Sequence, residues 1–251
     1  MTTTSNHVAA CVGLTALTVV GTAPSPAFAF AEVRTVTITN VPDIFGEWYL
    51  AVVKFAAGTP RPIQTFMEHF TELAIVLLAG LLALVWWHAR RKADRTMALT
   101  LLGGVGVVVS YALSEWAKTY LEAERPCRTF ADVVIIANEC PPTGDWSFPS
   151  NHSTIAGALA AAILLASWRV GLPAVPIGAA AAFSRVFVGV HYPHDVAAGF
   201  LLGAFTVLVL TPSLVRPSTA LVGRMRGRPL VGRLLTAGTP HDTTMSPAER
   251  R

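Results

Sequence analysis

Five long apolar segments constrain the fold of this chain more than any other feature of its sequence. Each reaches or approaches the roughly 20 residues that a helix needs to cross a bilayer. The composition agrees, because only 14% of the 251 residues are charged, against roughly 25% in an ordinary soluble domain. The sequence therefore predicts an all-α fold, a polytopic bundle of membrane helices. The five segments are Thr71–His88, Met97–Ala117, Thr154–Trp168, Leu172–Val190 and Val196–Val215.

A sixth apolar segment, Val8–Ala31, has two interpretations. Two prolines interrupt it, and Ala27-Phe28-Ala29 resembles a signal-peptidase site. A signal peptide normally carries Lys or Arg before its apolar run, and this segment carries neither. We favour an uncleaved helix, which brings the total to about six transmembrane helices. Retention or removal of residues 1–31 leaves the expected orientation of the rest unchanged.

Basic residues predict the orientation. The blocks Arg90–Arg95 and Arg216–Arg233 directly follow long apolar segments, as basic residues at the cytoplasmic ends of membrane helices do. Nucleic acid is a poor explanation for charge placed in this way. With both blocks inside, residues 118–152 lie on the extracytoplasmic side. We expect a membrane domain over residues 1–215 and a basic, flexible cytoplasmic tail over residues 216–251.

Two stretches on the expected outer side leave alternatives open. Asp43–Phe55 has apolar residues at helical spacing, which indicates either a helix along the membrane interface or a loop packed on the bundle. Cys127 and Cys140 bracket a short polar loop, and outside the cytoplasm they can pair as a disulfide or remain two unrelated thiols. No C-x-x-C pair occurs in the sequence, so a zinc site of that kind is unsupported.

Three clusters of polar residues fall in or beside the outer loops. In the first, Lys118 and Arg125 are separated by close to two helical turns, so both cations can share one face. In the second, residues 150–153 precede a membrane helix, whose N-terminal N–H groups suit an anion. In the third, Arg185 lies inside an apolar helix, where a charge is costly and indicates a functional site by default.

The third cluster also holds His191 and Asp195, spaced so that the carboxylate can reach the imidazole ring if the segment turns there. Together the clusters supply what phosphoryl transfer needs. Lys118, Arg125 and Arg185 provide positive charge for the phosphate oxygens. His191 can attack phosphorus while Asp195 fixes its tautomer, and His152 is left to protonate the leaving oxygen.

A metal site is the competing interpretation. His191, His194 and Asp195 could serve as ligands, with His152 as a fourth. Three nearby cations oppose a divalent metal and favour an anion. We therefore expect neither a metal nor another cofactor, and we interpret His194 as a structural residue.

The three clusters resemble the signature of the type 2 phosphatidic acid phosphatase superfamily. The resemblance covers Lys118–Pro126, Pro149–His152 and Ser184–Asp195, including Gly189, in matching order and spacing. It implies a six-helix bundle with a metal-free site at the outer leaflet, a phosphohistidine on His191, activation by Asp195 and a general acid at His152. It also implies that Ser150 and Asn151 join the three cations in binding phosphate. Many members have glycine in place of Asn151, and asparagine tolerates unusual backbone angles better than most residues.

The expected function is hydrolysis of a lipid phosphate or diphosphate ester on the outer face of the cell membrane. Such a site favours a polyprenyl diphosphate, such as undecaprenyl or decaprenyl diphosphate, which is recycled on that face for cell-wall synthesis. The alternatives are phosphatidic acid, phosphatidylglycerol phosphate, a polyprenyl phosphoribose phosphate, or transfer to an alcohol by the same histidine. A transporter is disfavoured, because transporter residues gather near the bilayer midplane. The superfamily that the clusters resemble also contains soluble vanadium haloperoxidases, and the long apolar helices argue against that branch. The sequence names no partner besides a membrane lipid and leaves the oligomeric state open.

Overall fold

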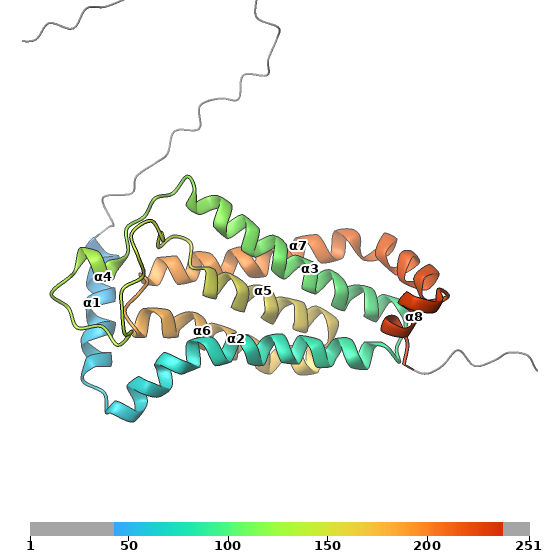
Figure 1. Cartoon of the computed structure of the whole chain (residues 1–251), viewed down its shortest axis with the longest axis horizontal. Helices are drawn as coiled ribbons and strands as arrows, with labels where there is room; N and C mark the ends of the chain where they lie inside the picture. The colour runs from blue at the N-terminus through green and yellow to red at the C-terminus, as the bar shows by residue number, and fades with distance from the viewer. Residues whose placement is uncertain (1–42, 238–251) are drawn as a thin grey trace, which may run out of the picture. The chain divides into compact units, whose positions relative to one another are not determined.

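The computed structural model describes residues 43–237, and the regular elements in that range are helices (Figure 1). They are α1 (Asp43–Ala57), α2 (Arg61–Ala89), α3 (Asp94–Lys118), α4 (Pro126–Thr129), α5 (Asn151–Ala166), α6 (Trp168–Phe187), α7 (Pro193–Arg226) and α8 (Pro229–Leu235).

All five predicted membrane segments are helical, as α2, α3, α5, α6 and α7. Four of them are long and apolar enough to cross a membrane, and α5 is a shorter apolar helix. The prediction of an all-α, multi-pass membrane bundle is therefore confirmed. The sixth candidate, Val8–Ala31, lies outside the described residues.

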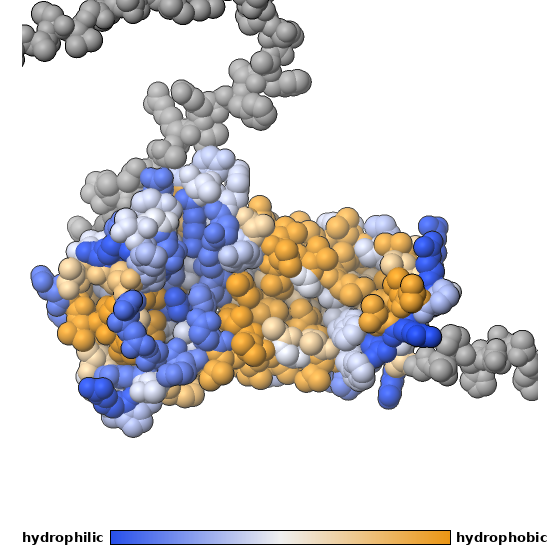
Figure 2. Space-filling view, viewed as in Figure 1, coloured by the Kyte–Doolittle hydropathy of each residue, from blue (hydrophilic) through white to orange (hydrophobic). Residues whose placement is uncertain are grey.

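Successive long helices run in opposite directions, so their connections gather at two ends of the bundle (Figure 1). The loop end carries α1, α4 and the connections that lead into α5 and α7. The α8 end carries α8 and the turn between α2 and α3. Figure 2 shows hydrophilic residues gathered at both ends of the face in view and mainly hydrophobic residues between them, as a bilayer requires of a bundle that spans it.

Helix α5 lies at the centre of the bundle and packs against α2, α3, α6 and α7. Its buried residues, many of them alanines, lie on several of its faces. A helix that is apolar all round belongs in the interior of a protein. A Cβ on Gly203 of α7 would lie 1.9 Å from the carbonyl oxygen of Thr154, so the two backbones touch. This close approach brings the start of α5 to the start of α7, where the N–H of Ser150 donates to the carbonyl of Asp195 at 3.2 Å.

Helix α1 excludes the interpretation of Asp43–Phe55 as a loop. The segment is helical and packs on α6 and α7. Tyr49 and Val53 are buried in that contact, while Trp48 and Phe55 stay exposed on the opposite face. The apolar stripe seen in the sequence is thus the outward face of α1, and a second stripe holds the helix on the bundle.

The α8 end differs from the expectation of a flexible tail after residue 215. Helix α7 continues to Arg226, and α8 packs against it. The Arg226 guanidinium donates to Asp94 Oδ1 at 2.6 Å and to the carbonyl of Lys92 at 2.9 Å. Hydropathy does not detect the helix beyond Val215 because residues 216–226 include three arginines, a proline, a serine and a threonine. Residues 238–251 of the expected tail lie outside the described residues.

Candidate active site

The loop end brings the three polar clusters of the sequence together. Lys118 ends α3, Arg125 directly precedes α4, Arg185 lies in the last turn of α6, and His191 lies in the turn before α7. Lys118 and Arg125 are buried, with 7% and 3% of their surface exposed. Buried cations that lie close together repel one another, so this arrangement favours an anionic ligand.

The turn that carries His191 is held from three sides. Gly189 adopts a φ of 90°, a backbone angle at which a side chain is strained. The Tyr49 hydroxyl of α1 donates to the Gly189 carbonyl at 3.0 Å, and Arg125 Nη1 donates to the Val190 carbonyl at 3.1 Å. A Cβ on Gly189 would lie 2.6 Å from Ile135, so the loop after α4 packs directly on the turn.

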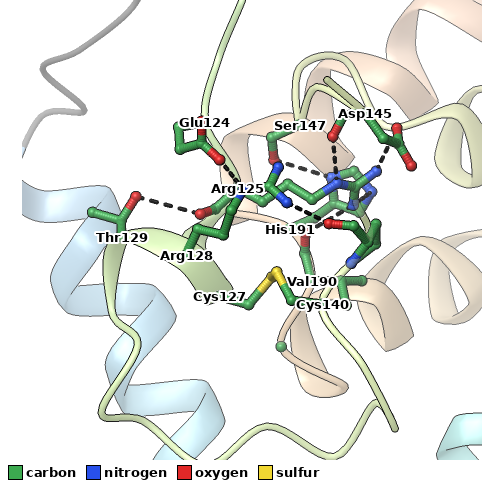
Figure 3. The surroundings of a disulfide bond; sticks show 12 residues. Glu124, Arg125, Cys127, Arg128, Thr129, Cys140, Asp145, Ser147, Val190 and His191 are labelled. Atoms are coloured by element: carbon green, nitrogen blue, oxygen red, sulfur yellow. Dashed lines mark hydrogen bonds and ion pairs between the residues drawn. A yellow bond between two sulfur atoms is a disulfide. The ribbon is translucent and has the colours of Figure 1, made fainter. Parts of the chain in front are cut away.

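The two nitrogens of the His191 ring have different partners (Figure 3). Arg125 Nη1 lies 3.2 Å from Nε2, and an arginine can only donate, so Nε2 accepts. We therefore assign the ring proton to Nδ1. Nδ1 lies 3.3 Å from Ser147 Oγ and 3.5 Å from Asp195 Oδ2. In this tautomer the lone pair of Nε2 points to Arg125.

Asp195 reaches His191 in the way that the sequence spacing suggested. It is the third residue of α7, and its Oδ2 also accepts the N–H of Tyr192 at 2.8 Å, which caps the helix. The Ser147 hydroxyl donates to the same Oδ2. Ser147 therefore lies between the carboxylate and the ring, and both groups can accept the Nδ1 proton in a hydrogen bond.

Burial lowers the pKa of His191 to about 4. The hydrogen bond with Asp195 opposes this effect, and the positive charge of Arg125 adds to it. The ring is consequently neutral near pH 7. A neutral imidazole with a fixed tautomer is the form that can act as a nucleophile.

Asp145 holds two of the predicted phosphate ligands. Its Oδ1 accepts from Arg125 Nη2 at 2.9 Å and lies 3.7 Å from Lys118 Nζ, and its backbone carbonyl accepts from Arg125 Nε. Burial alone raises the pKa of Asp145, but the hydrogen bond and charge of Arg125, together with Lys118, bring that pKa below its usual value. An ionised carboxylate thus neutralises part of the charge on Arg125 and Lys118.

Arg185 approaches the site from α6. Its Nη1 donates to Thr71 Oγ1 of α2 at 3.3 Å. Its Nε is buried and has no hydrogen-bond partner within residues 43–237. A buried donor of this kind calls for an acceptor, and a phosphate oxygen is an acceptor of the right charge.

Ser150 and Asn151 sit at the start of α5 as expected, but their side chains have other partners. Ser150 is the N-cap residue without a side-chain cap bond, and its Oγ accepts from Ser153 Oγ at 3.2 Å. Asn151 Oδ1 accepts from Ser114 Oγ of α3 at 2.7 Å, and its Nδ2 donates to Glu115. The Asn151 side chain therefore ties α5 to α3, while the first backbone N–H groups of α5 have no intrahelical acceptor.

His152, the third residue expected to do chemistry, lies one position further along α5. Its Nε2 lies 2.7 Å from Glu72 Oε1 on α2. About a third of the His152 side chain is exposed, at 32%. The ring is thus held by a carboxylate, and part of the side chain stays exposed.

A disulfide joins Cys127 and Cys140, with the Cα atoms 5.9 Å apart (Figure 3). The structure thus decides the alternative that the sequence left open. The bridge closes a loop that runs from Cys127 in α4 to Cys140. The carbonyl of Pro141, the next residue, accepts a hydrogen bond from Arg128. Arg125 stands two residues before Cys127, so the disulfide secures the loop beside the buried arginine.

Comparison with known proteins identifies the family. Residues 98–217 match the PAP2 superfamily, a stretch that contains every predicted site residue. The undecaprenyl-diphosphatase of Bacillus subtilis is 31% identical over 171 residues, which cover 65% of this chain and 82% of that protein. The chain belongs to the PAP2 superfamily. It is accordingly a membrane phosphatase, as the resemblance of the three clusters implied.

Further relatives of this PAP2 protein act on different lipids. The decaprenylphosphoryl-5-phosphoribose phosphatase of Mycobacterium tuberculosis is 35% identical over 148 residues, which cover 59% of this chain and 74% of that protein. Among solved structures, a PAP2 type phosphatidylglycerolphosphate phosphatase from Bacillus subtilis matches with a TM-score of 0.49 and 23% identity, over 70% of this chain and 88% of that one.

Four residues of this PAP2 site were not found by sequence reasoning: Thr71, Glu72, Asp145 and Ser147. Each contacts a predicted residue that is distant in sequence, so no local spacing reveals it. The acidic Glu72 at the edge of an apolar segment was the one available signal. His194, interpreted as structural, packs among the rings of Phe45, Phe148 and Tyr192.

Proposed function

We propose that this phosphatase hydrolyses a polyprenyl diphosphate through a covalent phosphohistidine on His191. The observation that carries the proposal is the neutral His191 ring, whose Nε2 lone pair points to Arg125 among three cations. The undecaprenyl-diphosphatase of Bacillus subtilis supports the choice of lipid. The Mycobacterium tuberculosis relative makes a polyprenyl phosphoribose phosphate the second candidate.

Binding of the terminal phosphate uses donors that the protein leaves available. Arg185 donates its buried Nε–H, Lys118 contributes its ammonium, and the first N–H groups of α5 contribute the positive end of a helix. Arg125 Nη1 moves its hydrogen bond from His191 Nε2 to a phosphate oxygen. That exchange frees the Nε2 lone pair at the moment when phosphorus arrives.

In the first step, His191 Nε2 forms a bond to phosphorus as the bond from phosphorus to the bridging oxygen breaks. The imidazolium of His152 gives a proton to that oxygen, and polyprenyl phosphate leaves. Asp195 and Ser147 keep the Nδ1 proton and stabilise the positive charge that forms on the ring. The three cations offset the charge on the remaining phosphate oxygens.

In the second step, water attacks phosphorus and the bond from phosphorus to Nε2 breaks. The now neutral His152 takes the proton of the water, and inorganic phosphate leaves. Both steps balance without a metal.

The site belongs on the extracytoplasmic face in this proposal. Its support is the basic character of the opposite end, where Arg90, Arg224 and Arg226 lie, and the disulfide at the loop end. A diphosphate released on that face by an enzyme that assembles surface polymers would reach the site by diffusion in the same leaflet.

Phosphate release from a panel of lipids in detergent tests the proposal. The panel holds polyprenyl diphosphate, polyprenyl phosphoribose phosphate, phosphatidic acid and phosphatidylglycerol phosphate, each with EDTA present. We expect the highest kcat/KM for polyprenyl diphosphate, and a loss of about a thousandfold or more in His191→Ala. Activity that EDTA abolishes, or that His191→Ala retains, would overturn the mechanism. A faster reaction with another lipid would replace the proposed substrate.

A further inference from the structure

Glu72 is the last acidic residue of α2 before a long apolar run, and no cluster of the family signature includes it. Its carboxylate reaches across to α5, where Oε1 lies 2.7 Å from His152 Nε2. Residues 73–87 that follow it carry no charge. A carboxylate at the edge of a membrane helix is costly unless it has a partner, and His152 is that partner.

The same turn of α2 contacts a second site residue. Thr71, next to Glu72 in sequence, accepts a hydrogen bond from Arg185 Nη1 at 3.3 Å. One turn of α2 thus contacts both the predicted general acid and one predicted phosphate ligand. Glu68 stands one turn earlier on the helix, and no hydrogen bond or ion pair to it is found among residues 43–237. It is the natural control.

The charges around His152 define what Glu72 does. Burial opposes an imidazolium at this position, and so do Arg185 and Arg125, the cations that face the ring. Glu72 is the anion that faces it. We propose that Glu72 is the positioning residue of the general acid: it accepts a hydrogen bond from Nε2–H of His152, favours the imidazolium that burial and two arginines oppose, and directs the Nδ1 proton to the leaving oxygen.

This inference rests on the proposed function and assigns a residue to its proton transfers. In the first step Nδ1 gives its proton to the leaving oxygen, and in the second step Nδ1 recovers a proton from water. The Nε2 proton stays in the bond to Glu72 throughout. Glu72 is therefore neither a nucleophile nor a proton donor, and it acts only through His152.

Leaving-group dependence distinguishes this role from a structural one. A general acid matters most when the leaving oxygen is strongly basic, as in an alkyl phosphate, and least when it is weakly basic, as in p-nitrophenyl phosphate. Glu72→Gln should lower kcat on an alkyl phosphate by about tenfold to a hundredfold and on p-nitrophenyl phosphate by less than about threefold. KM should change little on either ester.

Three further variants complete the design. Glu68→Gln makes the same charge change one turn away and should leave both rates unchanged. Glu72→Asp keeps a carboxylate and should restore part of the rate on the alkyl phosphate. His152→Ala should show the same dependence on the leaving group, and adding Glu72→Gln to it should cost little more, because both act on one proton.

The outcomes separate the two claims. A wild-type protein that releases phosphate from neither ester would overturn this inference, and one that also releases none from polyprenyl diphosphate would overturn the proposed function. An active wild type whose Glu72→Gln variant loses equally on both esters, or whose double variant loses the product of the single losses, would overturn the inference alone. Thermal melting of each purified variant identifies a loss that comes from unfolding.

Discussion

The two ends of the bundle hold their arginines in different ways. At the α8 end, Arg226 and Arg90 donate to carbonyls where helices stop, including those of Ala89 and Thr236. At the loop end, Arg125 and Arg185 converge on the surroundings of His191, with Lys118 beside them. The first arrangement places the arginines on helix-end carbonyls, which carry partial negative charge, and Arg226 also on the Asp94 carboxylate. The second gathers like charges around a nucleophile.

The difference teaches which charges serve folding and which serve chemistry. Like charges brought together cost stability, and a fold keeps them when an anion is to be bound. Counting arginines does not separate the two ends, because both are rich in them. The loop end is distinguished by two arginines that face one histidine ring.

The largest effect should come from replacing one arginine at each end by lysine. Arg185→Lys loses the planar fork that can bind two phosphate oxygens, so kcat/KM should fall about a hundredfold or more. Arg226→Lys should lower the melting temperature and leave kcat/KM within about twofold. Phosphate release, corrected for the fraction of folded protein, measures both. Equal losses in kcat/KM at the two ends would break the comparison.

The disulfide should stabilise the loop end and leave the α8 end unaffected. Replacing Cys127 and Cys140 by serine should reduce the free energy of unfolding by about 3 kcal/mol. The loop also holds Asp145 and Ser147 beside Arg125 and His191, so kcat/KM should fall as well. Thermal melting and phosphate release check this. A double variant with wild-type melting and activity would remove the disulfide from the account.

Two glycines of the loop end sharpen the comparison within that end. Gly189 and Gly144 have φ values of 90° and 91°, so alanine is strained at both, by about 1 kcal/mol or more. Only at Gly189 would the added Cβ meet Ile135, at 2.6 Å, while Gly144 has open space around it. Gly189→Ala should therefore lose more stability and also displace His191. Similar melting temperatures and rates for the two variants would contradict the packing of Ile135 on the turn.

The last prediction concerns pH. The folded pKa of His191, about 4, lies below the roughly 6.5 of an unfolded histidine. The folded state thus binds fewer protons between these values, so lowering the pH favours unfolding. Relative to His191→Gln, the wild type should lose up to about 1.4 kcal/mol per pH unit in this window. Melting of both proteins from pH 7 to pH 5 measures the loss. A difference that stays constant with pH would mean that the ring is not held neutral.

Much of the fold, and the gathering of the three polar clusters at one end of the bundle, followed from sequence because they obey short-range rules. Hydropathy located α2, α3, α5, α6 and α7, and the four-residue spacing of His191 and Asp195 survives as a helix cap. The rules fail where polar turns continue a helix, as at the end of α7 and the start of α2. They also fail where partners come from another helix.

Asn151 illustrates that second failure. Its position at the start of α5 was expected, yet its amide turns to Ser114 and Glu115 of α3. Glu72 is a second example: its sequence position gave it no role, because only the folded bundle brings α2 to His152. Contacts between distant segments depend on how helices pack, and the spacing of residues along one segment does not contain that information.

The most direct test of the central claim is to trap the covalent intermediate. Purified protein is mixed with polyprenyl diphosphate labelled in the terminal phosphate, quenched in alkali within a single turnover, digested and mapped by mass spectrometry. The account predicts a phosphoryl group on His191 that survives base and is lost in acid, and none in His191→Ala. A label on another residue, or turnover with no protein-bound phosphate at any time, would contradict it.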